Sequence, residues 1–214
     1  MPSQSAKSKE QYSGFLKDYS KLKPIKLKSK TKALRWVHPQ IKQRQYTSII
    51  IDPVIFYPQP MTQDKVSEQT LLELGKKFND LTKELAFNNA ISTTQTPGPG
   101  VLRLRSAFTA INIDAKGFKP QDIVPIRLLI KGVELADGLE DYHVTVFHEL
   151  ELLDTQTKEV LVKAIRKGNT LKLRNRQENL SSNHFDLLLE QWGLDIIEGF
   201  EQFSFVFNKN TEKN

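Results

Sequence analysis

The stretch His143–Ile165, HVTVFHELELLDTQTKEVLVKAI, decides the fold. Its first half alternates apolar and polar residues, which is the period of a half-buried strand. The inward face of that strand would carry Val144, Val146, His148, Leu150 and Leu152. Asp154-Thr155-Gln156-Thr157 then forms a turn, because the Asp154 carboxylate can accept local backbone N–H bonds. Glu159–Ile165 returns, so the stretch predicts an antiparallel hairpin.

Helical periodicity appears on both sides of this hairpin. A helix starting after Thr62 or Ser67 and ending near Asn88-Asn89 would share one apolar stripe, formed by Leu71, Leu74, Phe78, Leu81 and Leu85. A last helix from Ser182 or Asn183 would face the core with Phe185, Leu188, Leu189, Trp192 and Ile196. A third, short helix capped by Asp122 is predicted from Ile126, Leu129, Ile130 and Val133.

Further strands complete the pattern. Ala33–Val37 is short, whereas Ile49-Ile50-Ile51 lacks alternation and is predicted to be central, with both faces covered. The long strand Val101–Ile113 would have Leu102, Leu104, Phe108 and Ala110 on one face and Arg103 and Arg105 on the other. Phe203, Phe205 and Phe207 alternate as a closing strand would. The order predicts an α+β domain, in which two main helices pack on one face of a mixed or mainly antiparallel sheet.

Composition limits the class of protein. The 214 residues include no cysteine, which excludes thiol nucleophiles, Cys-bearing zinc sites and disulfide frameworks. No apolar run approaches the roughly eighteen residues of a membrane-spanning helix. The net charge of +6 is uneven: residues 1–33 hold nine lysines against Glu10 and Asp18, a balance of +7, and the other 181 residues balance at −1. The excess charge belongs to the N-terminal region.

Three regions follow from this. Residues 1–33 are predicted to be a basic flexible arm, because polar, lysine-rich sequence cannot bury enough apolar surface to fold alone. Residues 34–207 form a single globular α+β domain, and 208–214 a polar tail. Within the arm, residues 12–22 repeat aromatic and aliphatic side chains at spacings of three and four, which favours an amphipathic turn that docks on the body or on a partner. This docking segment consists of Tyr12, Phe15, Leu16, Tyr19 and Leu22.

A catalytic centre is not expected. His143 and His148 lie five apart on one strand and point to opposite faces, so they cannot share a metal ion. A hydrolase using His143 with Glu149 or Glu151 is a weak alternative, because a solvated strand face explains this cluster more simply. The Pro97–Gly100 stretch lacks the lysine and the following helix of a phosphate loop. We therefore expect no metal, no cofactor and no enzymatic activity.

A second basic segment lies after the hairpin turn. Its candidate contacts to a polyanion are Lys163, Arg166, Lys167, Lys172, Arg174 and Arg176. Aromatic side chains are not interleaved with them, as stacking of single-stranded nucleic acid requires. We expect a solvated loop here, and nucleic acid is not an expected partner.

Several blocks resemble DUF3313, a bacterial lipoprotein family of unknown function. The most specific is Ser13–Leu22, SGFLKDYSKL, which is similar to the segment that follows the lipid-carrying cysteine in that family. The others are Leu34–Pro39, Ile51–Val54, Pro97–Arg105, the stretch Glu149–Leu161 around Leu153-Asp154-Thr155, and Phe185–Trp192. This sequence departs from the family by lacking the signal and its cysteine, and by being unusually basic over residues 21–32.

The resemblance implies a diacylated anchor outside this chain and residence on the periplasmic face of a membrane, without an enzymatic activity. The leading interpretation is a non-enzymatic cell-envelope domain with a binding or assembly role, whose partners are the membrane through its anchor and an envelope protein or the cell wall. The alternative is a cytoplasmic protein whose basic arm binds nucleic acid or acidic membrane without specificity.

Overall fold

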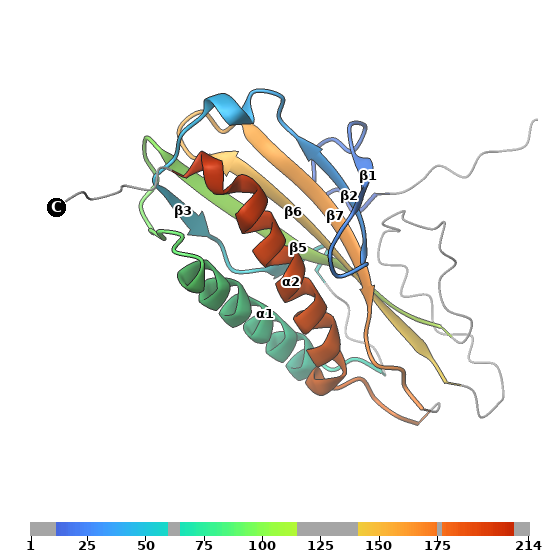
Figure 1. Ribbon diagram of the computed structural model, residues 1–214. Coiled ribbons are helices and arrows are strands. Elements are labelled where there is room, and N and C mark those ends of the chain that lie inside the picture. The colour runs from blue at the N-terminus through green and yellow to red at the C-terminus, as the bar shows by residue number, and fades with distance from the viewer. Residues whose placement is uncertain (1–11, 60–64, 115–140, 175–176, 208–214) are drawn as a thin grey trace, which may run out of the picture.

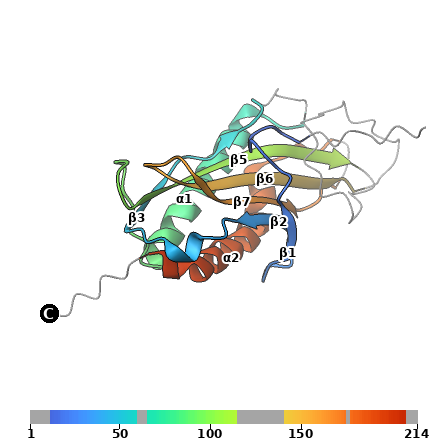
Figure 2. The same cartoon turned by 90° about the horizontal axis from the view of Figure 1, so that it is seen from above.

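The computed structural model describes residues 12–59, 65–114, 141–174 and 177–207. Within these ranges, seven strands form one mixed sheet in the order β1-β2-β7-β6-β5-β3, with β4 also pairing with β5. Two long helices lie in front of the sheet in Figure 1, and Figure 2 shows the same layers from above. We call the side under the helices the helix face and the other side the outer face. The predicted α+β class is confirmed.

The bounds of the elements are as follows. The strands are β1 (Lys23–Lys26), β2 (Lys32–Val37), β3 (Ser48–Ile51), β4 (Ile55–Phe56), β5 (Val101–Asp114), β6 (His143–Asp154) and β7 (Val160–Asn169). The helices are α1 (Glu68–Asn88) and α2 (Asp186–Phe203), with short 3-10 turns at Ile41–Gln43, Ser182–Phe185 and Ser204–Val206. No helix among the described residues is long and apolar enough to span a membrane.

The predicted hairpin is β6 and β7. Its turn is fixed as expected, because one Asp154 carboxylate oxygen accepts from the backbone N–H groups of Gln156 at 2.7 Å and Thr157 at 2.8 Å. The prediction of which β5 side chains share one face of the sheet is wrong for Ala110. Pairing with β6 shifts register between Phe108 and Ala110, so Thr109 is an extra residue and Ala110 turns to the outer face opposite Phe147.

Both main helices form where predicted. The Ser67 side chain caps α1 by accepting from the Thr70 N–H at 3.1 Å. Trp192 of α2 is fully buried and stacks on Phe108 of β5 with ring centroids 6.2 Å apart, and Phe78 of α1 meets both rings edge-on. This aromatic cluster joins the two helices to the sheet.

The N-terminal boundary differs from the prediction. The sheet already begins at Lys23, since β1 pairs antiparallel with β2. Ile25 of β1 faces the helices, whereas Lys23 and Lys26 are exposed. Lysines on an edge strand prevent pairing with other chains, so sequence that reads as a solvated linker is here a protected sheet edge.

Two strand predictions are wrong. Ile49-Ile50-Ile51 is covered on both faces as predicted, since Ile49 and Ile50 are buried, but it is the edge strand β3 and not a central strand. Its free edge is covered because the Ile49 backbone bonds to Ser92 and Thr94 of the loop after α1. The predicted closing strand is instead the last residue of α2, the 3-10 turn Ser204–Val206 and Phe207. Phe200, Phe203 and Phe207 follow the helical spacing of three and four and all line the space beneath α2.

Several predicted parts lie outside the described residues. These are the short helix after Asp122, residues 1–11 of the arm, Arg176 and the tail 208–214.

Candidate functional site

The helix face contains a cavity of about 160 Å³ between the sheet and the C-terminal half of α2. We call it the α2 slot. Its floor is formed by strand residues of β5, β6 and β7, namely Leu104, Leu150, Leu152, Val162 and Ala164. Its roof is formed by Ile196, Gly199, Phe200 and Phe203 of α2. Although α2 covers them, Leu104, Leu150, Leu152 and Ala164 are only half-buried, so the space above them is not filled by side chains.

Two glycines show where α2 packs closely on the sheet and where a space separates them. At Gly168 of β7, a Cβ atom would meet Leu188 Cδ1 at 2.3 Å and Trp192 Nε1 at 3.1 Å, so the N-terminal half of α2 touches the strand directly. At Gly199, a Cβ atom would meet no atom within 4 Å. Helix α2 is therefore anchored at Trp192 and separates from the sheet toward its C-terminal end.

A polar cluster forms the inner wall of the slot. Arg166 Nε donates to His148 Nδ1 at 3.2 Å, and Arg166 Nη1 donates to the Trp192 carbonyl at 3.3 Å. Its guanidinium lies over the Trp192 ring at 4.4 Å and 3.9 Å from Asp195 Oδ2, which also accepts from the Thr31 hydroxyl at 2.7 Å. The buried Arg166 and Asp195 charges thus compensate one another.

Burial determines the protonation states of this wall. Desolvation, assisted by the Arg166 charge, holds the pKa of His148 well below its usual value, so this histidine is neutral. Because its Nδ1 accepts from Arg166, its proton is assigned to Nε2. Desolvation also lowers the pKa of Arg166, to about 10. Three atoms of the wall are buried without a hydrogen-bond partner among the described residues: His148 Nε2, Arg166 Nη2 and Asp195 Oδ1.

Arg35 of β2 lies at the opposite border of the slot, beside Ile25 and Leu27. Its Nη1 donates to Gln202 Oε1 at 2.7 Å, and its guanidinium lies 5.6 Å from the centre of the Phe203 ring. Desolvation lowers the pKa of Arg35, opposed by the Glu198 charge. Within the described part of the chain, no carboxylate oxygen lies within 4.0 Å of this guanidinium.

The predicted docking segment lies on the outer face. We call residues 12–22 the strap. Leu16 is 1% exposed, Tyr12 stacks on Tyr19 at 4.1 Å, and Phe15 packs edge-on against Tyr57. The strap is a series of bends and contains no helical turn.

The Tyr19 hydroxyl organises the strap. It accepts from the backbone N–H groups of Gly14 at 3.0 Å and Leu16 at 3.1 Å, lies 3.1 Å from Ser13 Oγ, and donates to Glu149 Oε2 at 2.8 Å. Desolvation raises the pKa of Tyr19 to about 12 and also raises that of Glu149. These polar bonds close the bends without a helix.

The outer face at β6 is therefore not the solvated surface expected from the sequence, since Glu149 is fully buried and Glu151 nearly so. The residues of the hydrolase alternative also lie far apart. His143 lies six residues from Glu149 along one strand, a separation of about 20 Å at roughly 3.3 Å per residue. The structure does not bring this histidine and these carboxylates together.

The basic residues after the hairpin do not gather into one patch. Arg166 faces the slot and is buried, which removes it from any polyanion contact in this structure. Lys163 lies on the outer face, where it bonds to the Asp18 carbonyl at 2.9 Å and lies 5.5 Å from the Trp36 ring. Lys167 is buried, Lys172 lies 3.5 Å from Asp141, and Arg174 is exposed. Alternation along β7 divides them between the two faces.

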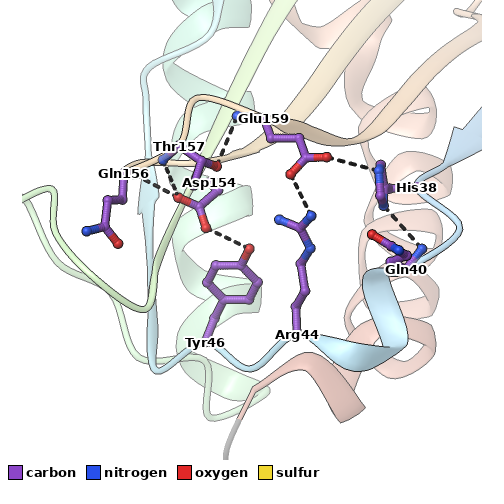
Figure 3. A network of polar contacts seen from close by, with 8 residues as sticks. All are labelled: His38, Gln40, Arg44, Tyr46, Asp154, Gln156, Thr157 and Glu159. Atoms are coloured by element: carbon purple, nitrogen blue, oxygen red, sulfur yellow. Dashed lines mark hydrogen bonds and ion pairs between the residues drawn. The ribbon is translucent and has the colours of Figure 1, made fainter.

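Two other polar networks have structural explanations. Asp154 accepts from the Tyr46 hydroxyl at 2.9 Å, and Glu159 contacts His38 at 3.0 Å and pairs with Arg44, which fixes residues 38–46 to the hairpin tip (Figure 3). A Ser181–His184–Glu178 chain, at 2.8 and 3.3 Å, has the residue types of a hydrolase, but its serine and histidine form the capping box of the turn before α2. Among the described residues, no group of three metal-ligating side chains converges.

Comparison with known proteins agrees with the resemblance noted from the sequence. The chain is 28% identical over 186 residues to the uncharacterized lipoprotein YdcL of Escherichia coli K12, covering 87% of this chain and 83% of that protein. Among solved structures, it is similar to the PelC dodecamer subunit from Paraburkholderia phytofirmans, with 10% identity, a TM-score of 0.35 and coverage of 80% of this chain and 95% of that one.

A DUF4136 family protein from Bacteroides thetaiotaomicron gives 8% identity, a TM-score of 0.38 and coverage of 83% and 97%. Structural likeness at this level carries no inference about function. The decisive match is to the family described as "Protein of unknown function (DUF3313)", which extends over residues 11–196. A match of that length includes the strap, the sheet and most of α2, and the chain therefore belongs to the DUF3313 family.

Proposed function

We propose that this chain is a non-enzymatic binding module of the cell envelope, held at the periplasmic face of a membrane by an N-terminal lipid and binding an apolar ligand in the α2 slot. The likeness to an uncharacterized lipoprotein supports the location. The open space at Gly199 is the observation that carries the binding role. A fold maintained only for its own stability would gain from filling a space of this size, because empty volume costs contacts.

A binding role also fits the side chains that the structure brings together. Glu149 of β6 is buried under the strap, the buried Glu151 is paired with Arg105, and the Ser181–His184 pair caps the turn before α2. The slot itself is lined mainly by apolar side chains, with few polar atoms within reach of a guest. Such a surface can hold a ligand, and the hydroxyl side chains that line it, Thr82 and Ser106, have no exposed general base beside them among the described residues.

Benzene provides the direct test, because cavities of about 150 Å³ lined by aliphatic side chains bind it. In methyl NMR spectra, benzene should shift the Leu150, Leu152 and Ile196 signals in a saturable way. Gly199→Leu should abolish that shift, since the new side chain projects into the slot from a position with no steric conflict at Cβ. Glu190→Leu, which adds the same side chain at an exposed position of α2, should leave binding unchanged. Absence of saturable shifts in the wild type would refute the proposed site.

The location has its own test. When the gene is expressed in a bacterium with its native upstream region, the product should incorporate labelled palmitate and sediment with membranes. Recovery of an unlabelled product in the cytoplasmic fraction would contradict the envelope assignment.

A further inference from the structure

We propose that the α2 slot binds the hydrocarbon chain of an anionic amphiphile whose carboxylate or phosphate group is held by Arg35 and Lys23 at the β1–β2 border. This inference rests on the proposed binding function and adds the chemical class of the ligand.

The first argument is a pair of like charges. Lys23 and Arg35 are directly opposite each other in the antiparallel β1–β2 ladder, so their side chains project from the same face. The next inward pair, Ile25 and Ala33, lines the slot, which places the two cations on the slot side. Like charges in directly opposite positions destabilise a sheet unless an anion lies between them. Within the described chain, neither cation has a carboxylate within 4.0 Å.

The second argument is the environment of Arg35. Its guanidinium is half-buried against the Phe203 ring and has lost part of its hydration, while its hydrogen-bonded partner, Gln202, is neutral. A planar guanidinium presents five donors that match the two oxygens of a carboxylate or phosphate. A bound anion would therefore restore the interactions that Arg35 gave up on burial.

The neighbouring acidic groups are already engaged. Glu198 accepts from the Lys28 backbone N–H at 2.8 Å and from Gln202 Nε2 at 2.8 Å. Glu201 pairs with the Lys28 ammonium at 2.8 Å. Glu198 acts on Arg35 only through longer-range attraction, and Gln202 Oε1 is neutral, so an anionic oxygen ligand of this guanidinium remains to be supplied from outside the described chain.

The inner end of the slot favours hydrocarbon. Arg166 and Asp195 form a compensated pair, and their unpartnered atoms are sealed from the cavity because each has almost no accessible surface. A head group could not reach them without moving the wall. The volume of about 160 Å³ is close to the roughly 150 Å³ of a benzene-binding cavity, which suggests room for about six carbon atoms. The polar group of the guest therefore lies at the Arg35 border and its chain lies inside.

The test compares octanoate with 1-octanol, which share a chain and differ in charge. In methyl NMR titrations both should bind the wild type, octanoate the more tightly, and each methylene added from butanoate to hexanoate should tighten binding about four-fold. Arg35→Gln should weaken octanoate about ten-fold and change 1-octanol less than two-fold. Lys23→Gln should act in the same direction with a smaller effect, and Glu190→Leu serves as the neutral control.

The outcomes separate the two proposals. Equal affinity of octanoate and 1-octanol, or an Arg35→Gln variant that binds octanoate normally, overturns the head-group assignment while the slot remains a binding site. If neither amphiphile nor benzene produces saturable shifts, the proposal that the slot binds an apolar ligand is refuted. Arg35→Lys keeps the charge but loses the forked donors, so it should bind octanoate more tightly than Arg35→Gln and less tightly than the wild type, and this intermediate affinity distinguishes loss of the anion contact from a folding defect.

Two sources could supply this chemistry, a free fatty acid and a phospholipid. Dihexanoyl phosphatidylglycerol below its critical micelle concentration should bind through the same residues if the phosphate is accepted. Binding of octanoate but not of this lipid would identify a fatty acid as the ligand, and preference for the lipid would identify a phospholipid chain.

Discussion

Replacing Tyr19 by Phe tests whether the strap contributes to the stability of the folded domain. The change removes one oxygen atom that bonds to Glu149, Gly14 and Leu16 and leaves the buried ring in place. Glu149 would lose its bond from the strap at Oε2, and its Oε1 is already buried without a partner among the described residues. Leaving a buried acceptor without its hydrogen bond costs about 1–3 kcal/mol. The two backbone donors can turn to water, so we expect the free energy of unfolding to fall by about 1–3 kcal/mol.

Urea denaturation at neutral pH measures this loss, and amide hydrogen exchange at Gly14 and Leu16 should accelerate in parallel. Tyr57→Phe is the matched control, because its ring packs on Phe15 but its hydroxyl makes no hydrogen bond within the described residues. That variant should stay within about 0.5 kcal/mol of the wild type. Equal effects of the two substitutions would show that the Tyr19 hydroxyl does not hold the strap to the sheet.

Three further predictions concern packing and pH. Trp192→Ala should lower the free energy of unfolding by about 3–5 kcal/mol in urea titrations, and a loss below about 1 kcal/mol would contradict its role as the anchor of α2. Gly168→Ala should destabilise by about 1–3 kcal/mol, because its Cβ would lie 2.3 Å from Leu188 Cδ1, whereas Gly199→Ala should stabilise by up to about 1 kcal/mol. Burial raises the pKa of Glu149 above 4.5, so the folded state holds this proton more tightly and stability should fall as the pH rises from about 4.5 through the raised pKa. Glu149→Gln should flatten that fall, and an unchanged slope would assign it to other groups.

Local periodicity was sufficient to predict the elements that contact their sequence neighbours. The β6–β7 hairpin, its Asp154 turn and the apolar stripes of α1 and α2 depend on spacings within about twenty residues, and each was predicted correctly. The bulge at Thr109 was not, because a bulge inserts one residue without a compositional signal and reverses the facing of everything after it.

Contacts between distant parts of the chain could not be read in the same way. The sequence places Glu149 on a solvated strand face because the residue that covers it, Tyr19, lies 130 residues earlier in the sequence. The lysines of β1 resemble a linker for the same reason, since the strand exists only through its pairing with β2. Phe200, Phe203 and Phe207 have helical spacing, and together with Gly199 they were the available signal for the slot. The alternation of Phe203, Phe205 and Phe207 favoured a strand instead.

The N-terminal region contacts both faces of the sheet, the outer face through the strap and the helix face through β1. The strap covers the outer face, so a lipid anchor preceding it would tether the domain from the side away from α2. The chain then passes into β1, where Ile25 reaches the slot and Lys23 stands opposite Arg35. A tether on one face would leave the slot on the other face free to exchange the proposed ligand, while β1 connects the two faces through only a few residues. Loosening the strap should therefore alter ligand affinity through the β1–β2 border before it disturbs the aromatic cluster at Trp192. Comparing the octanoate affinity of the wild type with that of Tyr19→Phe would measure this coupling.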